Sequence, residues 1–184
     1  MELPRTPSLR LDGKRALISG AGRGIGLGAA AALAEAGAHV VLAARSAVEI
    51  EEAAAAIRAA GGSAEALPMD VADIETTAAK IAAAGPFDAL VNNAGTNRPA
   101  AFEDVRVEDF DAVMNLNVRA AFFAAQAVAR GMIAAGKGGA IVHVSSQMGH
   151  VGGARRSVYC ASKWAIEGIA RAVRLVACQV PFSL

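Results

Sequence analysis

The chain has 184 residues, which is enough for a single domain to bury a core without disulfides or metal ions. Hydrophobic residues make up 54% of the sequence and aromatic residues only 4%, so the core must be built mainly from Ala, Val, Leu and Ile. The formal net charge of +1 gives no reason to expect nucleic acid or an anionic membrane surface as a partner. We predict one domain over residues 1–184, with residues 1–10 as an N-terminal extension.

Short apolar runs alternate with longer, Ala-rich amphipathic stretches, a pattern typical of βαβ units around a parallel sheet. Strands are predicted over residues 15–19, 39–43, 65–69, 87–91 and 140–144. Helices are predicted over residues 27–36, 48–60, 74–84, 107–135 and 157–178. The sequence therefore predicts an α/β fold: a doubly wound parallel sheet with helices on both faces and no internal domain boundary.

Neither the cysteines nor the apolar runs point to secretion or to a membrane. Cys160 and Cys178 are too few for a disulfide framework, and on one helix they would lie roughly 27 Å apart at 1.5 Å per residue. Residues 1–15 carry charges and no apolar centre, so we expect no secretory signal. No apolar run approaches the ~20 residues of a membrane span. We expect a cytoplasmic protein that binds neither nucleic acid nor membrane.

A glycine-rich turn joins the first predicted strand to the helix after it. Glycines allow positive φ and close approach of the backbone, and the free N–H groups at a helix start favour phosphate oxygens. The turn is therefore a candidate site for the pyrophosphate of a dinucleotide, although tight turns that bind nothing also use glycine. We assign Gly20, Gly24 and Gly26 to this site.

The end of the second strand indicates which dinucleotide would bind. An acidic side chain there would accept the adenosine ribose hydroxyls and select NAD, whereas this chain has Ala44 followed by Arg45. Arg45 can pair with a 2′-phosphate, and Arg23 in the glycine turn is a second cation within reach. We predict NADP(H) as the cofactor, with NAD(H) as the alternative. Two solvated surface arginines are the other interpretation.

Tyr159 and Lys163 stand four residues apart in the last predicted helix, so both side chains project from one helical face. An ammonium one turn away favours the phenolate, which suits Tyr159 to give a proton to a carbonyl oxygen or to take one from an alcohol. Such a pair alone is often surface decoration. Tyr159 is, however, the only tyrosine, and Ser146 lies 13 residues before it, just after the fifth strand.

These residues resemble the short-chain dehydrogenase/reductase family, in which a hydroxyl residue precedes a Gly-x-x-x-Gly-x-Gly turn and Ser, Tyr and Lys follow at this spacing. The resemblance covers roughly residues 11–170 and implies a Rossmann-like sheet. It also implies that Ser146 donates a hydrogen bond to the substrate oxygen as charge develops, and that Asn117 helps to hold a water linking Lys163 to solvent. Cofactor contacts are implied for Tyr159 and Lys163, and for Ile25, Asp70, Val71, Asn92, Ala94 and Gly95.

Two of these assignments have structural alternatives. The resemblance places Asp70 against the adenine amino group, but Asp70 could instead cap the next helix, as Asp73 can by position. The resemblance makes residues 92–95 steady the sheet beside the cofactor, but Asn-Asn-Ala-Gly could be only a turn. The histidines at 39, 143 and 150 show no ligand spacing, so no metal site is expected.

The resemblance implies reversible hydride transfer between the nicotinamide and a small carbonyl or secondary alcohol of the sugar, polyol or 3-oxoacyl type. In the family two long helices, here 107–135 and 157–178, commonly join subunits, so a homo-oligomer is expected. After the Lys the family continues with a strand, a Pro-Gly loop, a substrate-covering segment and a last strand, which residues 171–184 do not resemble. We therefore expect the last strands to be missing, with a catalytically inactive dinucleotide-binding fragment or regulatory subunit as the alternative function.

Overall fold

The computed structural model describes residues 8–176, with side chains over residues 8–173, and these residues form one five-stranded sheet. Its strands are β1 (Arg15–Ser19), β2 (His39–Ala44), β3 (Ser63–Pro68), β4 (Ala89–Asn92) and β5 (Ala140–His143). Their spatial order is β3-β2-β1-β4-β5, and all neighbours are parallel. The predicted α/β class with a doubly wound parallel sheet is confirmed.

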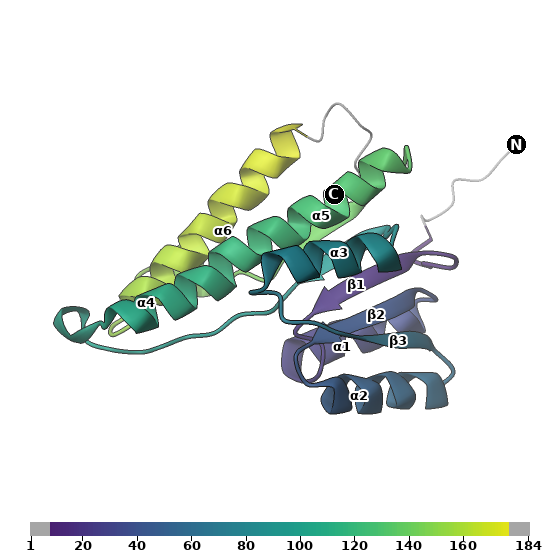
Figure 1. The fold of residues 1–184 in the computed structure, drawn as a ribbon, viewed down its shortest axis with the longest axis horizontal. Coiled ribbons are helices and arrows are strands. Elements are labelled where there is room, and N and C mark those ends of the chain that lie inside the picture. The colour runs from purple at the N-terminus through teal and green to yellow at the C-terminus, as the bar shows by residue number, and fades with distance from the viewer. Residues whose placement is uncertain (1–7, 177–184) are drawn as a thin grey trace, which may run out of the picture.

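Helices cover both faces of this sheet (Figure 1). One face carries α1 (Gly24–Glu35) and α2 (Ala47–Ala59), and the other carries α3 (Ile74–Ala84) and α5 (Ala121–Ala134). In line with α5 and before it in the chain lies α4 (Val107–Met114), and α6 (Ser157–Val176) runs alongside and contacts α4 (Figure 1). Short 3-10 turns occur at Phe102–Asp104 and Gln147–Gly149.

The central strand β1 shows how the sequence divides between the two faces. Ala16 and Ile18 pack into the core beneath α1 and α2, whereas Leu17 between them packs into the core beneath α3 and α5. Successive side chains of a strand point to opposite faces, so a strand covered on both sides has to be apolar throughout. The uninterrupted apolar runs in the sequence are explained by the burial of these strands on both faces of the sheet.

The predicted helix 107–135 is not one regular α-helix. A π-helical segment, Asn115–Ala120, separates α4 from α5. Within it the side chain of Asn117 accepts from Thr96 N at 2.7 Å and donates to Thr96 O at 2.9 Å. Single π turns often occur where a side chain is needed at a particular place. The spacing of apolar residues does not predict such a turn, because the α-helices on either side of it keep the helical spacing.

Strand ends also differ by up to two residues from the prediction. β3 begins at Ser63, opposite His39, and β4 begins at Ala89, opposite Ala16. The partner strand therefore decides where each strand starts, and composition does not. The predicted end of the last helix at Cys178, the tail 177–184 and residues 1–7 of the proposed extension lie outside the described residues.

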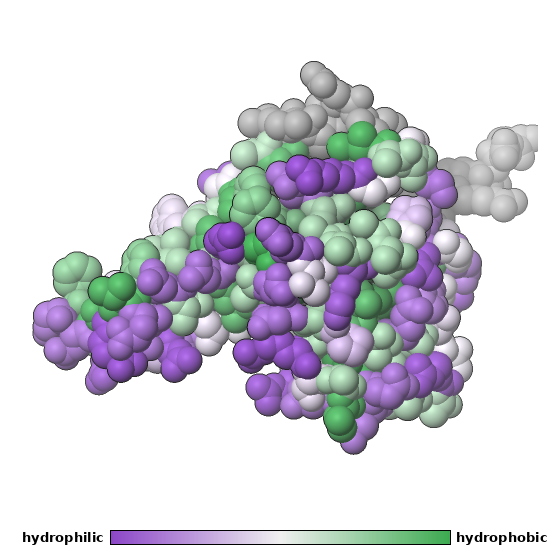
Figure 2. All heavy atoms as spheres, in the orientation of Figure 1, coloured by the Kyte–Doolittle hydropathy of each residue, from purple (hydrophilic) through white to green (hydrophobic). Residues whose placement is uncertain are grey.

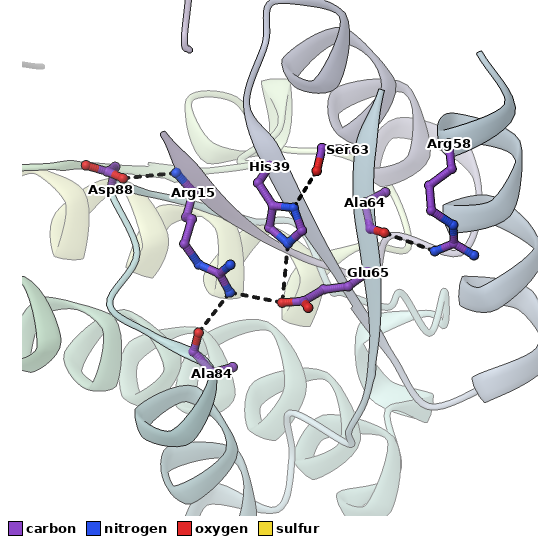
Figure 3. A network of polar contacts seen from close by, with 8 residues as sticks. All are labelled: Arg15, His39, Arg58, Ser63, Ala64, Glu65, Ala84 and Asp88. Carbon is purple, nitrogen blue, oxygen red and sulfur yellow. Dashed lines mark hydrogen bonds and ion pairs between the residues drawn. The ribbon is translucent and has the colours of Figure 1, made fainter. Parts of the chain in front are cut away.

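Polar contacts join the amino ends of β1, β2 and β3, at the sheet edge away from the glycine turn (Figure 3). Arg15 Nη2 lies 2.9 Å from Glu65 Oε1, and His39 Nδ1 lies 2.7 Å from Ser63 Oγ. The backbone N–H of Arg15 donates to Asp88 at 2.9 Å. These contacts join the starts of the three strands, and the bond from His39 to Ser63 gives His39 a structural role at this end of the sheet.

The chain between β4 and α4 leaves the sheet and returns as a protruding tip (Figure 1). Hydrophilic side chains gather over this tip (Figure 2). Arg106 pairs with Glu108 at 3.1 Å and with Asp109 at 2.8 Å.

Within the described part of the chain, none of the helices combines the length and apolarity that crossing a membrane requires.

Candidate active site

The glycine turn is closed by packing against the segment that follows β4. Gly20 has a φ of +66°, and a Cβ placed there would lie 3.1 Å from Ala94 Cα. A Cβ at Gly26 would lie 2.6 Å from Asn93 Nδ2 and closer still to the Gly20 carbonyl oxygen. α1 begins at Gly24 with no side chain capping it. Its first N–H groups are therefore available to an anion.

Ser19 and Asn93 join β1 to the segment after β4. The hydroxyl of Ser19 accepts from Asn93 N at 3.0 Å and from Ala94 N at 3.1 Å. The side-chain amide of Asn93 donates in return to the carbonyls of Ser19 and Gly20, at 3.0 and 3.1 Å. These four bonds hold the residues after β4 against the glycine turn.

A cavity of about 1070 Å³ opens beside this junction, where β1, β2 and β4 end. Ligands of open α/β sheets bind at the carboxyl ends of the strands. Of the predicted cofactor residues, those lining the cavity are Gly20, Arg23, Ile25, Arg45, Asp70, Val71, Ala94 and Gly95. Gly24, Gly26 and Asn92 are not among the lining residues, and neither are the four predicted catalytic residues, two of which, Tyr159 and Lys163, were also predicted to contact the cofactor.

Asp70 lines the cavity, and a different aspartate caps α3. Asp73 is the N-cap of that helix and accepts from Thr76 N at 3.1 Å. Asp70 instead accepts from Ala72 N at 3.0 Å, within the turn that leads into α3. The capping alternative for Asp70 is therefore wrong.

Lys163 projects from α6 toward the end of β5. Its Nζ donates to Val144 O at 2.7 Å and lies 5.6 Å from the centre of the Tyr159 ring. Only 8% of Lys163 is exposed. Tyr159 is half-buried one turn earlier on the same helix, so the helical spacing does bring the two groups together as the sequence predicted.

Asn117 links the π-helical segment to α6 and to the chain after β4. It is 2% exposed, and besides its two bonds to Thr96 its Nδ2 donates to Ser162 Oγ at 3.0 Å. Ser162 Oγ in turn donates to Tyr159 O at 2.7 Å. Asn117 therefore lies two hydrogen bonds from the backbone of Tyr159.

Ser146 follows β5 and precedes the 3-10 turn Gln147–Gly149. Its Oγ accepts from Met148 N at 3.1 Å. The turn packs on α6, where Met148 Sδ lies 3.8 Å from Cys160 Sγ. The loop of Ser146 therefore rests on the part of α6 that carries Tyr159.

Asn92, also predicted for this site, is buried in the sheet and donates to Ala121 O at 2.6 Å.

Residues 14–179 match the family described as short chain dehydrogenase. The chain belongs to this family. This short-chain dehydrogenase is 41% identical to L-xylulose reductase from Mesocricetus auratus over 167 residues, which cover 91% of this chain and 67% of the reductase. It therefore spans about two thirds of the length of that relative.

Solved structures of the family share the fold of this short-chain dehydrogenase. A short-chain type dehydrogenase/reductase from Mycobacterium marinum superposes with a TM-score of 0.91 at 34% identity, over 96% of this chain and 74% of that one. A gluconate 5-dehydrogenase from Burkholderia cenocepacia, in complex with NADP and tartrate, superposes with a TM-score of 0.90 at 36% identity, over 96% and 70% of the two chains.

Several cavity residues of this short-chain dehydrogenase escaped the sequence-based prediction. Asn93 lay within the predicted segment 92–95 but was not itself named as a cofactor contact. Other cavity residues that were not predicted include Ser46, Glu49, Thr96, Arg98, Asn115 and Leu116. Their positions depend on which loops meet above the sheet, and no local pattern reports that.

Burial changes the charge behaviour of two groups in this short-chain dehydrogenase. Burial lowers the pKa of Lys163 below its ordinary value. Burial also lowers the pKa of His143, and the charge of Lys163 lowers it further. His143 pairs with Asn92 in the sheet, and its Nδ1 lies 3.4 Å from Asn92 Nδ2. A neutral imidazole that accepts this bond fits both observations.

Replacing His143 with Asn is expected to reduce the amount by which the free energy of unfolding falls when the pH is lowered. The pKa of His143 is lowered from 6.5 in the folded chain, so as the pH falls the unfolded chain binds this proton first. Stability that is present above about pH 6.5 is then lost as the pH falls toward the folded pKa. Asn keeps an acceptor near the position of Nδ1 and binds no proton. Urea unfolding at about pH 7.5 and about pH 5.5 measures the difference, and equal pH dependence in both proteins would contradict the expectation.

Proposed function

We propose that this chain is an NADP(H)-dependent oxidoreductase that transfers hydride reversibly between the nicotinamide and a carbonyl or secondary alcohol of a small sugar or polyol. The observation that carries the proposal is the junction at the end of β5. There Lys163 is held by Val144 O, with Tyr159 beside it and Asn117 bonded to the same helix through Ser162. This junction lies at the carboxyl ends of the parallel strands, and the glycine-lined cavity opens at the same end of the sheet.

The residues of the cavity fit a phosphorylated dinucleotide. The uncapped start of α1 offers N–H groups to a pyrophosphate, and the tight contact at Gly26 leaves no room for a side chain there. Arg23 and Arg45 line the same cavity and can pair with a 2′-phosphate. When bound, the cofactor supplies or accepts the hydride. The protein supplies position and charge.

Each proposed catalytic residue has a distinct task. The hydroxyl of Tyr159 gives its proton to the carbonyl oxygen during reduction and takes it back during oxidation. Ser146 Oγ donates a hydrogen bond to the same oxygen as negative charge develops on it. The ammonium of Lys163, 5.6 Å from the Tyr159 ring centre, favours the phenolate that remains. Asn117 positions α6 against the chain after β4 through Ser162 and Thr96.

The substrate class is proposed from the relatives. One relative is named for the reduction of L-xylulose, and one solved neighbour is a gluconate 5-dehydrogenase bound to NADP and tartrate. We therefore choose small polyhydroxylated ketones and alcohols over 3-oxoacyl groups. Oxidation of NADPH by the purified chain with L-xylulose and a panel of related sugars tests the proposal. NADPH binding without any turnover is the result that the inactive-fragment alternative requires.

Replacing Arg45 with Ala is expected to weaken NADPH binding about tenfold while leaving NADH binding within about twofold. The physical reason is the loss of one charge-assisted, bidentate contact to the 2′-phosphate, a group that NADH lacks. Titration calorimetry with the two cofactors measures the ratio. An equal loss for both would show that Arg45 acts on the shared part of the dinucleotide, and NADP(H) preference would then need another source.

A homo-oligomer and a cytoplasmic location are further parts of the proposal. The long helices keep large apolar side chains at the surface, since Phe122 is 41% exposed on α5 and Trp164 is 54% exposed on α6. Burying such side chains against a second copy would remove apolar surface from water. Light scattering of the purified chain measures its mass in solution.

A further inference from the structure

The first turn of α2 carries an acidic side chain that the helix itself does not use in full. Ser46 caps this helix, and its Oγ accepts from Glu49 N at 3.3 Å. Ser and Glu at this spacing form a capping box when the carboxylate returns a bond to the backbone N–H of the cap. Among the contacts of the described residues only the first of these two bonds is made. The carboxylate of Glu49 is therefore left for another role.

The carboxylate of Glu49 lies against the glycine turn. A Cβ placed on Gly22 would lie 3.0 Å from Glu49 Oε2 and 3.2 Å from Glu49 Cβ. Glu49 also lines the large cavity, together with Arg23 from the glycine turn and Arg45 from the end of β2. Near α2 and the glycine turn the cavity wall thus carries Arg23, Arg45 and Glu49, and the cavity as a whole is also lined by Arg98 and Asp70.

We infer that Glu49 is a cofactor-specificity residue that opposes the two arginines and weakens the binding of a 2′-phosphate. The inference rests on the proposed function, because it assumes that the adenosine end of a dinucleotide occupies this part of the cavity. A phosphate monoester carries close to two negative charges near neutral pH, so a carboxylate beside it is repelled. A free 2′-hydroxyl is neutral and can donate to the same carboxylate. Glu49 therefore brings the affinities for NADP(H) and NAD(H) closer together.

The size of the effect follows from charge and screening. Glu49 is exposed at the cavity wall, so its repulsion acts through a largely aqueous medium and is reduced by salt. Removing one charge near a dianion under these conditions should change a binding ratio by a factor of about three to ten. An uncharged residue of the same shape should produce this change without disturbing α2.

Replacing Glu49 with Gln tests the inference with two nucleotides that differ only in the 2′-phosphate, namely 2′,5′-ADP and 5′-AMP. Calorimetry at low salt gives the ratio of their dissociation constants for the wild-type chain and for the variant. We expect the variant to favour 2′,5′-ADP by an additional factor of about three to ten, and we expect high salt to shrink this gain. These fragments report on the adenosine end alone, so the measurement does not depend on turnover.

Glu52→Gln is the matched control, because Glu52 is exposed on the same helix, carries the same charge and does not line the cavity. Its ratio should stay within about twofold of the wild type. An unchanged ratio in Glu49→Gln, or an equal gain in Glu52→Gln, overturns the inference while leaving the proposed function intact. If the wild-type chain binds neither these nucleotides nor NADPH, the proposed function fails and the inference fails with it.

Discussion

Replacing Tyr159 with Phe is expected to lower kcat for NADPH-dependent reduction by about a thousandfold, the size of effect typical for losing a positioned proton donor. Phe keeps the ring that packs one turn before Lys163 and removes only the hydroxyl. NADPH binding should stay within about twofold, because Tyr159 does not line the nucleotide cavity. Steady-state kinetics and calorimetry on the same preparation measure the two quantities.

The ratio of these two effects decides what Tyr159 does. A large loss of kcat with intact NADPH binding and an unchanged urea midpoint is the signature of a group that acts on the reacting atoms. If the variant turns over at the wild-type rate, the proton comes from elsewhere and the proposed role of Tyr159 is wrong. If NADPH binding falls in parallel with kcat, Tyr159 serves to shape the cavity.

Replacing Gly26 with Ala is expected to destabilise the fold by about 3 kcal/mol and to abolish NADPH binding. The added Cβ would lie 2.6 Å from Asn93 Nδ2 and closer still to Gly20 O, so both the glycine turn and the segment after β4 would have to move. Two of the contacts that hold these segments together are the bonds from Asn93 to Ser19 O and Gly20 O. Urea unfolding and NADPH titration measure the outcome.

Gly28→Ala is the control for this substitution, because Gly28 lies in the same helix and a Cβ there meets nothing within 4 Å. Alanine is the better helix former, so this variant should gain about 0.5–1 kcal/mol of stability and bind NADPH normally. If Gly26→Ala were as stable as Gly28→Ala, the packing that shapes the phosphate-binding turn would not be as tight as the contacts indicate.

Much of the fold could be predicted because its determinants are local. The apolar runs of β1 and β2 record burial on both faces of the sheet, and α3 begins and ends at the predicted residues 74 and 84. The glycine turn could be placed for the same reason, since a strand, a turn and a helix follow one another directly along the chain. The family resemblance added roles for Asn117 and Asp70 that no local pattern assigns.

Predictions failed where one segment depends on another. The helix over 107–135 is interrupted at Asn115–Ala120, the segment from which Asn117 bonds to Thr96 across the fold. β4 starts later than predicted, where β1 offers it a partner. Asn93 was predicted only as part of the segment 92–95, because its bonds to Ser19 and Gly20 join residues more than 70 positions apart and no local pattern reports them.

The sequence by itself determined the parallel α/β architecture, the glycine turn and the placing of Tyr159 and Lys163 on one helical face. Each of these rests on periodicity or spacing within a few turns of chain. Only the tertiary structure decided that Lys163 is buried against Val144, that Asp73 and not Asp70 caps α3, and that Glu49 lies over Gly22. The physical reason is that charge, burial and close contact depend on what the folded chain brings near a residue, and such neighbours are distant in sequence.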